Sequence, residues 1–224
     1  MFYGGFVYGI LAPLTILGVI VLAILALSGR SDPDTRGDRA RVLYLSLVSF
    51  IALFTVLFAL VSLGSTAARS LLDDGQSECI DPSDPACFGI DAEFGGGEQH
   101  TRELLNSTGV AVVAAAVLVF HRRRTREVVD DPGFAGSAAA RTFNAYLYAV
   151  AFTAMVLLLA AAAVALPALI RTIAPGLTAT GDSSFERDAA LLDLVPALVA
   201  GAGAAVIYLT HWRAASALRR GGND

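Results

Sequence analysis

The sequence predicts an all-α integral membrane protein, a helical bundle of five transmembrane helices with its N-terminus outside the cytoplasm and its C-terminus inside. Three observations support this prediction. The chain of 224 residues is 55% apolar, which is unusual for a soluble fold of this size. Five segments are apolar over roughly the 20 residues that a helix needs to cross a bilayer. The arginines are concentrated in alternate connections between those segments.

The five apolar segments occupy residues 6–27, 42–63, 104–120, 146–166 and 191–209. The third is the shortest and begins with the polar residues 106–108, so a re-entrant or interfacial segment is its alternative interpretation. The first could be mistaken for a signal peptide, because Ala26-Leu27-Ser28 resembles a cleavage site. Its apolar run is longer than a usual signal core, however, and the MFYGG before it has no basic side chain. We therefore expect an uncleaved first span.

Arginine placement predicts the orientation of the chain. All sixteen basic residues are arginine. With the N-terminus outside, twelve of the sixteen fall in the inner segments 29–41, 122–142 and 213–224. Short cytoplasmic loops have such an excess of basic residues. The arginine-only, alanine-rich composition is typical of a GC-rich bacterial gene, so we expect a multi-pass protein of the bacterial cell (plasma) membrane.

This topology predicts the boundaries of each part of the chain. The parts are a first transmembrane helix (1–28), an inner loop (29–41), a first hairpin (42–121) with a long outer loop (64–103), an inner loop (122–142), a second hairpin (143–212) and an inner tail (213–224).

Both cysteines, Cys79 and Cys87, lie in the long outer loop with two prolines between them. An oxidising outer face permits a disulfide bond, and we expect these two residues to form one. The alternative is a pair of free thiols or a metal site. It is weaker because no CxxC spacing is present and only His100 is nearby.

The two predicted hairpins resemble each other in sequence. The second span matches the fourth at an offset of 102 residues, and the third matches the fifth at an offset of 90. The matches least expected by chance in apolar sequence are Arg39/Arg141, Tyr44/Tyr146, Phe50/Phe152, Arg69/Arg171, Glu103/Asp193, His121/His211 and Arg123/Arg213. Repeats of the same orientation are related by an axis along the membrane normal. We therefore predict one extra helix followed by a duplicated helix pair.

The sequences that begin and end the two copies carry a family resemblance. They are RVLYLSLVSF (41–50) and NAYLYAVAF (144–152), with FHRRR (120–124) and THWRAA (210–215). Together they resemble an uncharacterised bacterial multi-pass membrane family, a domain of unknown function numbered fifty-six seventy-one. The resemblance covers about 39–216. The first copy departs from the His-Trp-Arg ending, because Arg122 stands where the second has Trp212. The resemblance implies topology and no activity.

Two ion pairs are predicted at the outer ends of the hairpins. Arg69 and Arg171 follow the second and fourth spans, and Glu103 and Asp193 begin the helices that return. Because a hairpin brings these ends together, we predict the pairs Arg69–Glu103 and Arg171–Asp193. The alternative is that all four side chains face water, where such pairs contribute only about 0–1 kcal/mol.

His121 and His211 end the third and fifth spans and are the candidate cofactor ligands. Paired histidines on neighbouring helices can ligate haem iron. Both residues lie at the inner water boundary beside arginines, however, and a polar ring there is typical of an interface anchor. We therefore expect no cofactor, and a haem site on these two histidines is the alternative.

The small residues Ala197, Gly201 and Ala205 recur at every fourth position of the fifth span. Such spacing lets helix backbones approach closely. We expect these residues to serve contacts inside the protein, with a partner helix as the alternative.

The spans have no ionisable residue in their central parts, which argues against an ion-coupled transporter. A net charge of −4 argues against a nucleic-acid partner. Nucleotide-loop, zinc and nucleophile-elbow motifs are absent from the sequence. We expect a non-enzymatic scaffold, assembly or accessory subunit, with a membrane-protein partner or a homo-oligomer in the lipid bilayer. The alternative is a small carrier or channel for an uncharged or lipidic ligand between the hairpins. An enzyme using His121, His211, Asp130 or Asp131 ranks third.

Overall fold

The protein is all-helical in the residues that its computed structural model describes, namely 16, 18–20, 38–72, 96–174 and 183–221. Four long helices account for almost all of them: α2 (Asp38–Leu72), α3 (Gly96–Val129), α4 (Ala138–Ile173) and α5 (Ser183–Gly221). Each is long and apolar enough to cross a membrane. They contain the second to fifth predicted spans. Most of the first span lies outside the described residues, although Ile16 and residues 18–20 are helical.

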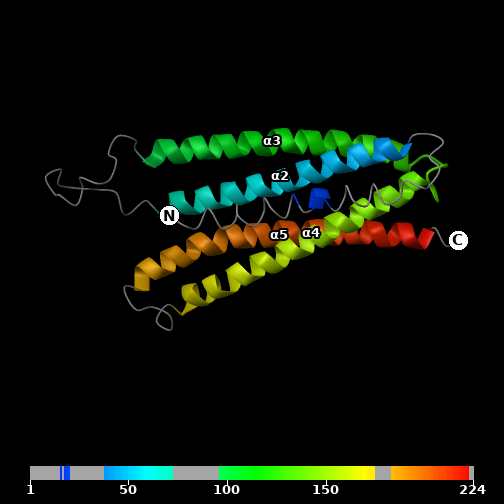
Figure 1. Cartoon of the computed structure of the whole chain (residues 1–224). Helices are drawn as coiled ribbons and strands as arrows, with labels where there is room; N and C mark the ends of the chain where they lie inside the picture. The colour runs from blue at the N-terminus through cyan, green and yellow to red at the C-terminus, as the bar shows by residue number, and fades with distance from the viewer. Residues whose placement is uncertain (1–15, 17, 21–37, 73–95, 175–182, 222–224) are drawn as a thin grey trace.

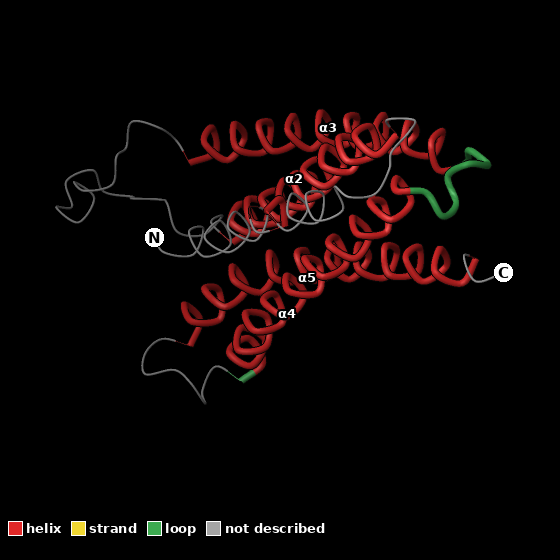
Figure 2. The backbone as a smooth tube through the Cα atoms, turned by 45° about the vertical axis from the view of Figure 1, so that its right-hand side comes forward, coloured by secondary structure: helices red, strands yellow, loops and turns green. Residues whose placement is uncertain are grey.

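The four helices form two antiparallel pairs (Figure 1). Helix α3 packs along α2, and α4 packs along α5. The pairs meet through α2, which contacts both α5 and α4. Figure 2 shows the same order from another direction, with α3 on the far side of α2 from the second pair. The chain therefore places α3 at the edge of the bundle.

The helices are longer than the spans predicted from hydropathy. Helix α3 continues to Val129 and α4 begins at Ala138, so the connection is 130–137 and not 122–142. Helix α5 likewise continues through most of the predicted tail. Hydropathy detects only the part of a helix that lipid surrounds, whereas alanine, arginine and glutamate continue a helix into water. The ends of α3 and α5 and the starts of α2 and α4 together form what we call the arginine-rich end.

The connection between α3 and α4 is a defined turn. The Asp131 carboxylate accepts a hydrogen bond of 2.7 Å from the Gly133 backbone N–H, the pattern by which Asp starts a turn. Gly136 has a φ of +76°, which glycine adopts without strain. Ser137 then caps α4, because its hydroxyl accepts a hydrogen bond of 3.1 Å from the Ala140 N–H. The Asp-Asp-Pro sequence thus ends α3 as a helix breaker.

The larger of two clusters of buried side chains has no member from α3. Its members are Phe50, Phe54, Leu57 and Val61 of α2, Tyr146, Leu147, Ala149, Val150, Ala154 and Leu157 of α4, and Ala204, Ile207 and Ala215 of α5. A smaller cluster at the arginine-rich end joins α2 to the turn through Val42, Leu45, Val128, Phe134 and Ala139.

Small residues set the closest approaches between the helices. A Cβ atom added to Gly203 of α5 would overlap Leu57 of α2, and one added to Gly64 would lie 3.1 Å from Val199 Cγ2. Gly18 similarly leaves room for the Phe50 ring. Gly201 faces α4, where its Cβ would lie 3.5 Å from the Cβ of Ala161. These glycines therefore serve contacts within the protein.

Candidate functional site

The ion pair expected in the second hairpin is present. Arg171 Nη2 lies 2.9 Å from Asp193 Oδ2. The two side chains are 31% and 11% exposed, so the pair is only partly reached by solvent. It ties the end of α4 to the start of α5 at the end opposite the arginine-rich end.

The first hairpin differs from the prediction at the equivalent place. No ion pair joins Arg69 to Glu103 among the described residues, because Glu103 lies against Thr66 instead, with Oε2 3.5 Å from the Thr66 hydroxyl. At an offset of 102 the second hairpin has Ala168 in place of Thr66. Alanine offers no hydroxyl. In the second hairpin no hydroxyl competes for the Asp193 carboxylate at this position, and Arg171 is its donor.

Both cysteines lie outside the described residues, so the Cys79–Cys87 disulfide stays a prediction. Within the described part of the chain, no three His, Cys, Asp or Glu side chains gather to hold a metal ion.

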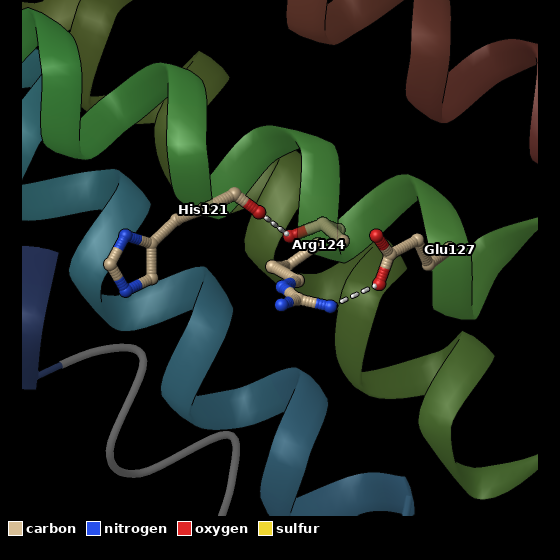
Figure 3. Close-up of polar contacts among 4 residues, drawn as sticks. His121, Arg124 and Glu127 are labelled. Atoms are coloured by element: carbon tan, nitrogen blue, oxygen red, sulfur yellow. Dashed lines mark hydrogen bonds and ion pairs between the residues drawn. The ribbon is translucent and has the colours of Figure 1, made fainter.

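The two candidate histidines make matching contacts at the arginine-rich end. The Nδ1 atoms of His121 and His211 lie 2.9 Å and 2.8 Å from the backbone carbonyl oxygens of Val117 and Ile207, one turn earlier. The His121 ring packs 5.9 Å from the ring of Tyr44, and it extends over α2 in Figure 3. The His211 ring packs 6.2 Å from Tyr146, edge to face.

These contacts engage each histidine within its own hairpin. Tyr44 is on α2, beside α3, and Tyr146 is on α4, beside α5. A haem held by two histidines needs both rings to converge on one iron. The geometry instead fits two interface anchors that fix the tyrosines on the neighbouring helices.

The residue that follows each histidine differs between the two hairpins. Arg122 of α3 is exposed at the arginine-rich end. Trp212, at the matching position of α5, instead packs between Tyr148 and Tyr208, with ring centroids 6.0 Å from each.

The neighbouring Arg124 is engaged within α3 (Figure 3). Its guanidinium pairs with Glu127 at 3.0 Å and lies 5.7 Å from the centre of the Phe120 ring. Of the acidic residues considered for an enzyme, Asp131 is occupied by the turn that it starts. The Thr210 hydroxyl lies 3.3 Å from His211 Nδ1, but it donates to the backbone carbonyl oxygens of Val206 and Ile207 at 2.8 Å and 3.0 Å, so its proton is engaged within α5.

Sequence reasoning did not single out the buried polar atoms near this end. The hydroxyls of Ser46 and Ser49 and the Oδ1 of Asn144 are buried and have no hydrogen-bond partner among the described residues. Ser46 and Ser49 are separated by one helical turn, and that spacing in an apolar span was the signal available in the sequence.

Helix α3 is far more exposed than its neighbours. Only 6% of its most apolar stretch is buried, against 39%, 39% and 33% in α2, α4 and α5. The large apolar side chains of α3 that are exposed are Leu105, Val110, Val112, Val113, Val119 and Phe120.

Comparisons with known families, with curated proteins and with solved structures find no match. The resemblance to an uncharacterised bacterial membrane family therefore stays a prediction. The function is argued below from the chain's own residues.

Proposed function

We propose that the protein is a non-enzymatic membrane component, a scaffold or accessory subunit, that binds a transmembrane helix of a second membrane protein along α3. The observation that supports this is the uncovered surface of α3. Leu105 and Val113 on that surface are 68% and 65% exposed, and a Cβ atom at Gly109 would meet nothing within 4 Å.

The proposed topology places this surface within the membrane. The chain crosses the cell membrane five times, with the N-terminus outside and the C-terminus inside, and its two hairpins arise from one duplicated helix pair. The arginine excess supports the orientation. The matching contacts Tyr44–His121 and Tyr146–His211 support the duplication.

The duplication explains why the α3 surface is suited to a helix and not only to lipid. At an offset of 90, Leu105, Gly109 and Val113 correspond to Val195, Val199 and Gly203 of α5. Those three residues of α5 pack on α2, at Gly64 and Leu57. The same stripe is therefore a helix contact in one copy and uncovered in the other.

The chemistry of the stripe indicates its occupant. Gly109 lets another backbone approach closely, which is how small residues drive association of helices in lipid. Asn106 lies on the same face, is exposed, and makes no hydrogen bond with the described residues. An amide can bond across to a partner helix. The partner expected is an apolar helix with a small residue at the crossing, as α2 has at Gly64.

A carrier with its ligand between the hairpins is less well supported. Leu57 fills the space above Gly203, and Val199 fills the space above Gly64. These contacts leave no room for a ligand at these two positions of the α2–α5 interface.

The test is site-specific photo-cross-linking in membranes of the protein's own host. The cross-linking side chain replaces Val113 on α3 or, as a control, Leu159 on α4, which is 61% exposed. We expect one reproducible protein adduct at position 113 and only lipid adducts at position 159. Adding Gly109→Leu should abolish the adduct at 113, whereas Ala162→Leu on exposed α4 should not. Lipid adducts alone at both positions, or a cross-linked homodimer at 113, would overturn the proposal.

A further inference from the structure

Two contacts between α2 and α5 each place a large side chain against a glycine of the other helix. Leu57 of α2 occupies the space that a Cβ atom on Gly203 of α5 would need. Val199 of α5 lies against Gly64 of α2, where an added Cβ atom would lie 3.1 Å from Val199 Cγ2. Residue numbers fall along α2 as they rise along α5, so the two helices are antiparallel at this contact (Figure 1). Large and small residues therefore alternate across this interface in a defined order.

The uncovered stripe of α3 has the opposite order. At the offset of 90 residues that aligns the two hairpins, Val199 corresponds to Gly109 and Gly203 corresponds to Val113. A Cβ atom on Gly109 would meet nothing within 4 Å, so the helix surface is hollowed there. Val113 has a side chain where α5 has a glycine, and this side chain is 65% exposed. The stripe thus presents a small residue where α5 presents a large one, and a large residue where α5 presents a small one.

This order disfavours a second copy of the protein as the occupant of the stripe. The helix that would take the place of α2 in a second copy is α2 itself or its counterpart α4. The residue of α2 that lies against Gly203 is Leu57, and at the offset of 102 the residue of α4 is Leu159. Either leucine would meet the side chain of Val113 instead of a glycine. Overpacked contacts of this kind oppose association and select against the wrong partner.

We propose, on the basis of the docking function proposed above, that the partner helix is antiparallel to α3 and has a small residue facing Val113 and a large apolar residue in the hollow at Gly109. The corresponding positions of α2, 57 and 64, are seven residues apart. Two turns of a helix take about seven residues, so both side chains lie on one face. The partner helix therefore has glycine, alanine or serine, followed seven residues later by leucine, isoleucine or phenylalanine. The small residue allows the close backbone approach that stabilises helix pairs in lipid.

The experiment measures energy transfer between the full-length protein, labelled at its C-terminus, and labelled synthetic peptides in phosphatidylcholine vesicles. One peptide has the natural sequence of α2, residues 38–72. The other has Leu57→Gly and Gly64→Leu, which exchanges the two residues and keeps the composition. We expect the wild-type protein to bind the exchanged peptide about tenfold or more tightly than the natural one, because overpacking at Val113 opposes the natural peptide.

A reciprocal exchange on α3 should reverse this preference. Gly109→Val combined with Val113→Gly gives α3 the order found in α5, so the natural α2 peptide should then bind more tightly. Both positions are uncovered, so this variant should fold normally, and unfolding in bicelles checks that it does. The matched control is Leu159→Ala combined with Ala163→Leu on exposed α4, which should keep the preference of the wild-type protein.

Equal binding of the two peptides, binding of neither, or a preference that the α3 exchange does not reverse would overturn the proposal. The peptides test the order of residues on the stripe, whereas cross-linking at position 113 tests whether the host supplies a partner. A host protein captured at position 113 without discrimination between the peptides would overturn this proposal alone. Discrimination between the peptides without a captured host protein would overturn the proposed function and support the order of residues required on α3.

Discussion

The two helix hairpins are held together by different polar contacts. In the first, Ser62 of α2 hydrogen-bonds Ser107 of α3 at 2.9 Å, and Thr66 lies against Glu103. The corresponding positions in the second hairpin are Val164/Ala197 and Ala168/Asp193. There the polar contact is a single ion pair from Arg171 to Asp193.

This difference follows from the neighbours that each returning helix has. Helix α5 is covered by both α4 and α2, so close apolar packing holds it in place. Helix α3 packs extensively on α2 alone among the described helices. In lipid, apolar side chains gain little by moving from the bilayer onto another helix. Interhelical hydrogen bonds therefore position α3 on α2 while most of its surface stays available.

The largest effect should come from filling the contact between the hairpins. We expect Gly203→Val to lower the free energy of unfolding by about 1–3 kcal/mol, because its side chain would overlap Leu57. Gly109→Val on α3 has open space around it and should leave the stability of the isolated protein unchanged. Unfolding in bicelles measures both, and equal effects would show that α3 and α5 are not differently packed.

The next largest effect should be loss of the ion pair in the second hairpin. Asp193→Ala should cost about 1–3 kcal/mol, between the values for exposed and buried pairs, since Arg171 would be left without its partner. Arg69→Ala in the first hairpin should cost almost nothing. A double-mutant cycle of Arg171→Ala with Asp193→Ala should give a coupling energy well above zero. If the effects of Arg171→Ala and Asp193→Ala on stability are additive, the ion pair does not stabilise the second hairpin, and the two hairpins do not differ in this respect.

A smaller effect is expected from the hydroxyl pair of the first hairpin. Ser62→Ala should cost roughly 0.6 kcal/mol, the average for a hydrogen bond between helices in lipid. Ser70→Ala is the control on the same helix, because the Ser70 hydroxyl donates to the Ala67 carbonyl oxygen of α2 itself. If Ser70→Ala lowers the stability as much as Ser62→Ala does, the Ser62 hydroxyl has no special role in joining α2 to α3.

The smallest effect should come from Thr66→Val, which removes the hydroxyl beside Glu103 but keeps the shape of this buried side chain. We expect a change below about 0.5 kcal/mol, because the contact that is lost is 3.5 Å long, at the limit of a hydrogen bond. The informative result is the coupling: in the Thr66→Val background, Arg69→Ala should become costly. If Arg69→Ala still has no effect on stability in that background, a group other than Thr66 keeps Arg69 and Glu103 apart.

Hydropathy was sufficient to predict α2, α3, α4 and α5, because apolar length is the property that a bilayer selects. It could not predict where they end: α3 continues to Val129 because arginine, threonine and glutamate extend a helix through water. The pair Arg171–Asp193 followed from hairpin geometry. The choice of Thr66 by Glu103 did not, since it depends on which of two donors one turn apart faces the partner helix.

The candidate site was only partly predictable for the same reason. His121 and His211 were identified from sequence as interface anchors, and their contacts with Tyr44 and Tyr146 match that role. The exposure of Arg122 depends on the rotation of α3 about its axis, which no repeat of apolar residues sets in a helix apolar on nearly all sides.

The most direct test of the central claim, that α3 is the face on which a partner helix docks, is the intact mass of the complex extracted gently from the host's own membranes. Native mass spectrometry should detect a reproducible second protein with the wild-type chain and with Ala162→Leu on α4. Gly109→Leu on α3 should yield the same protein without that partner and with unchanged stability. A lone protomer in all three preparations, or a partner retained in Gly109→Leu, would contradict the account.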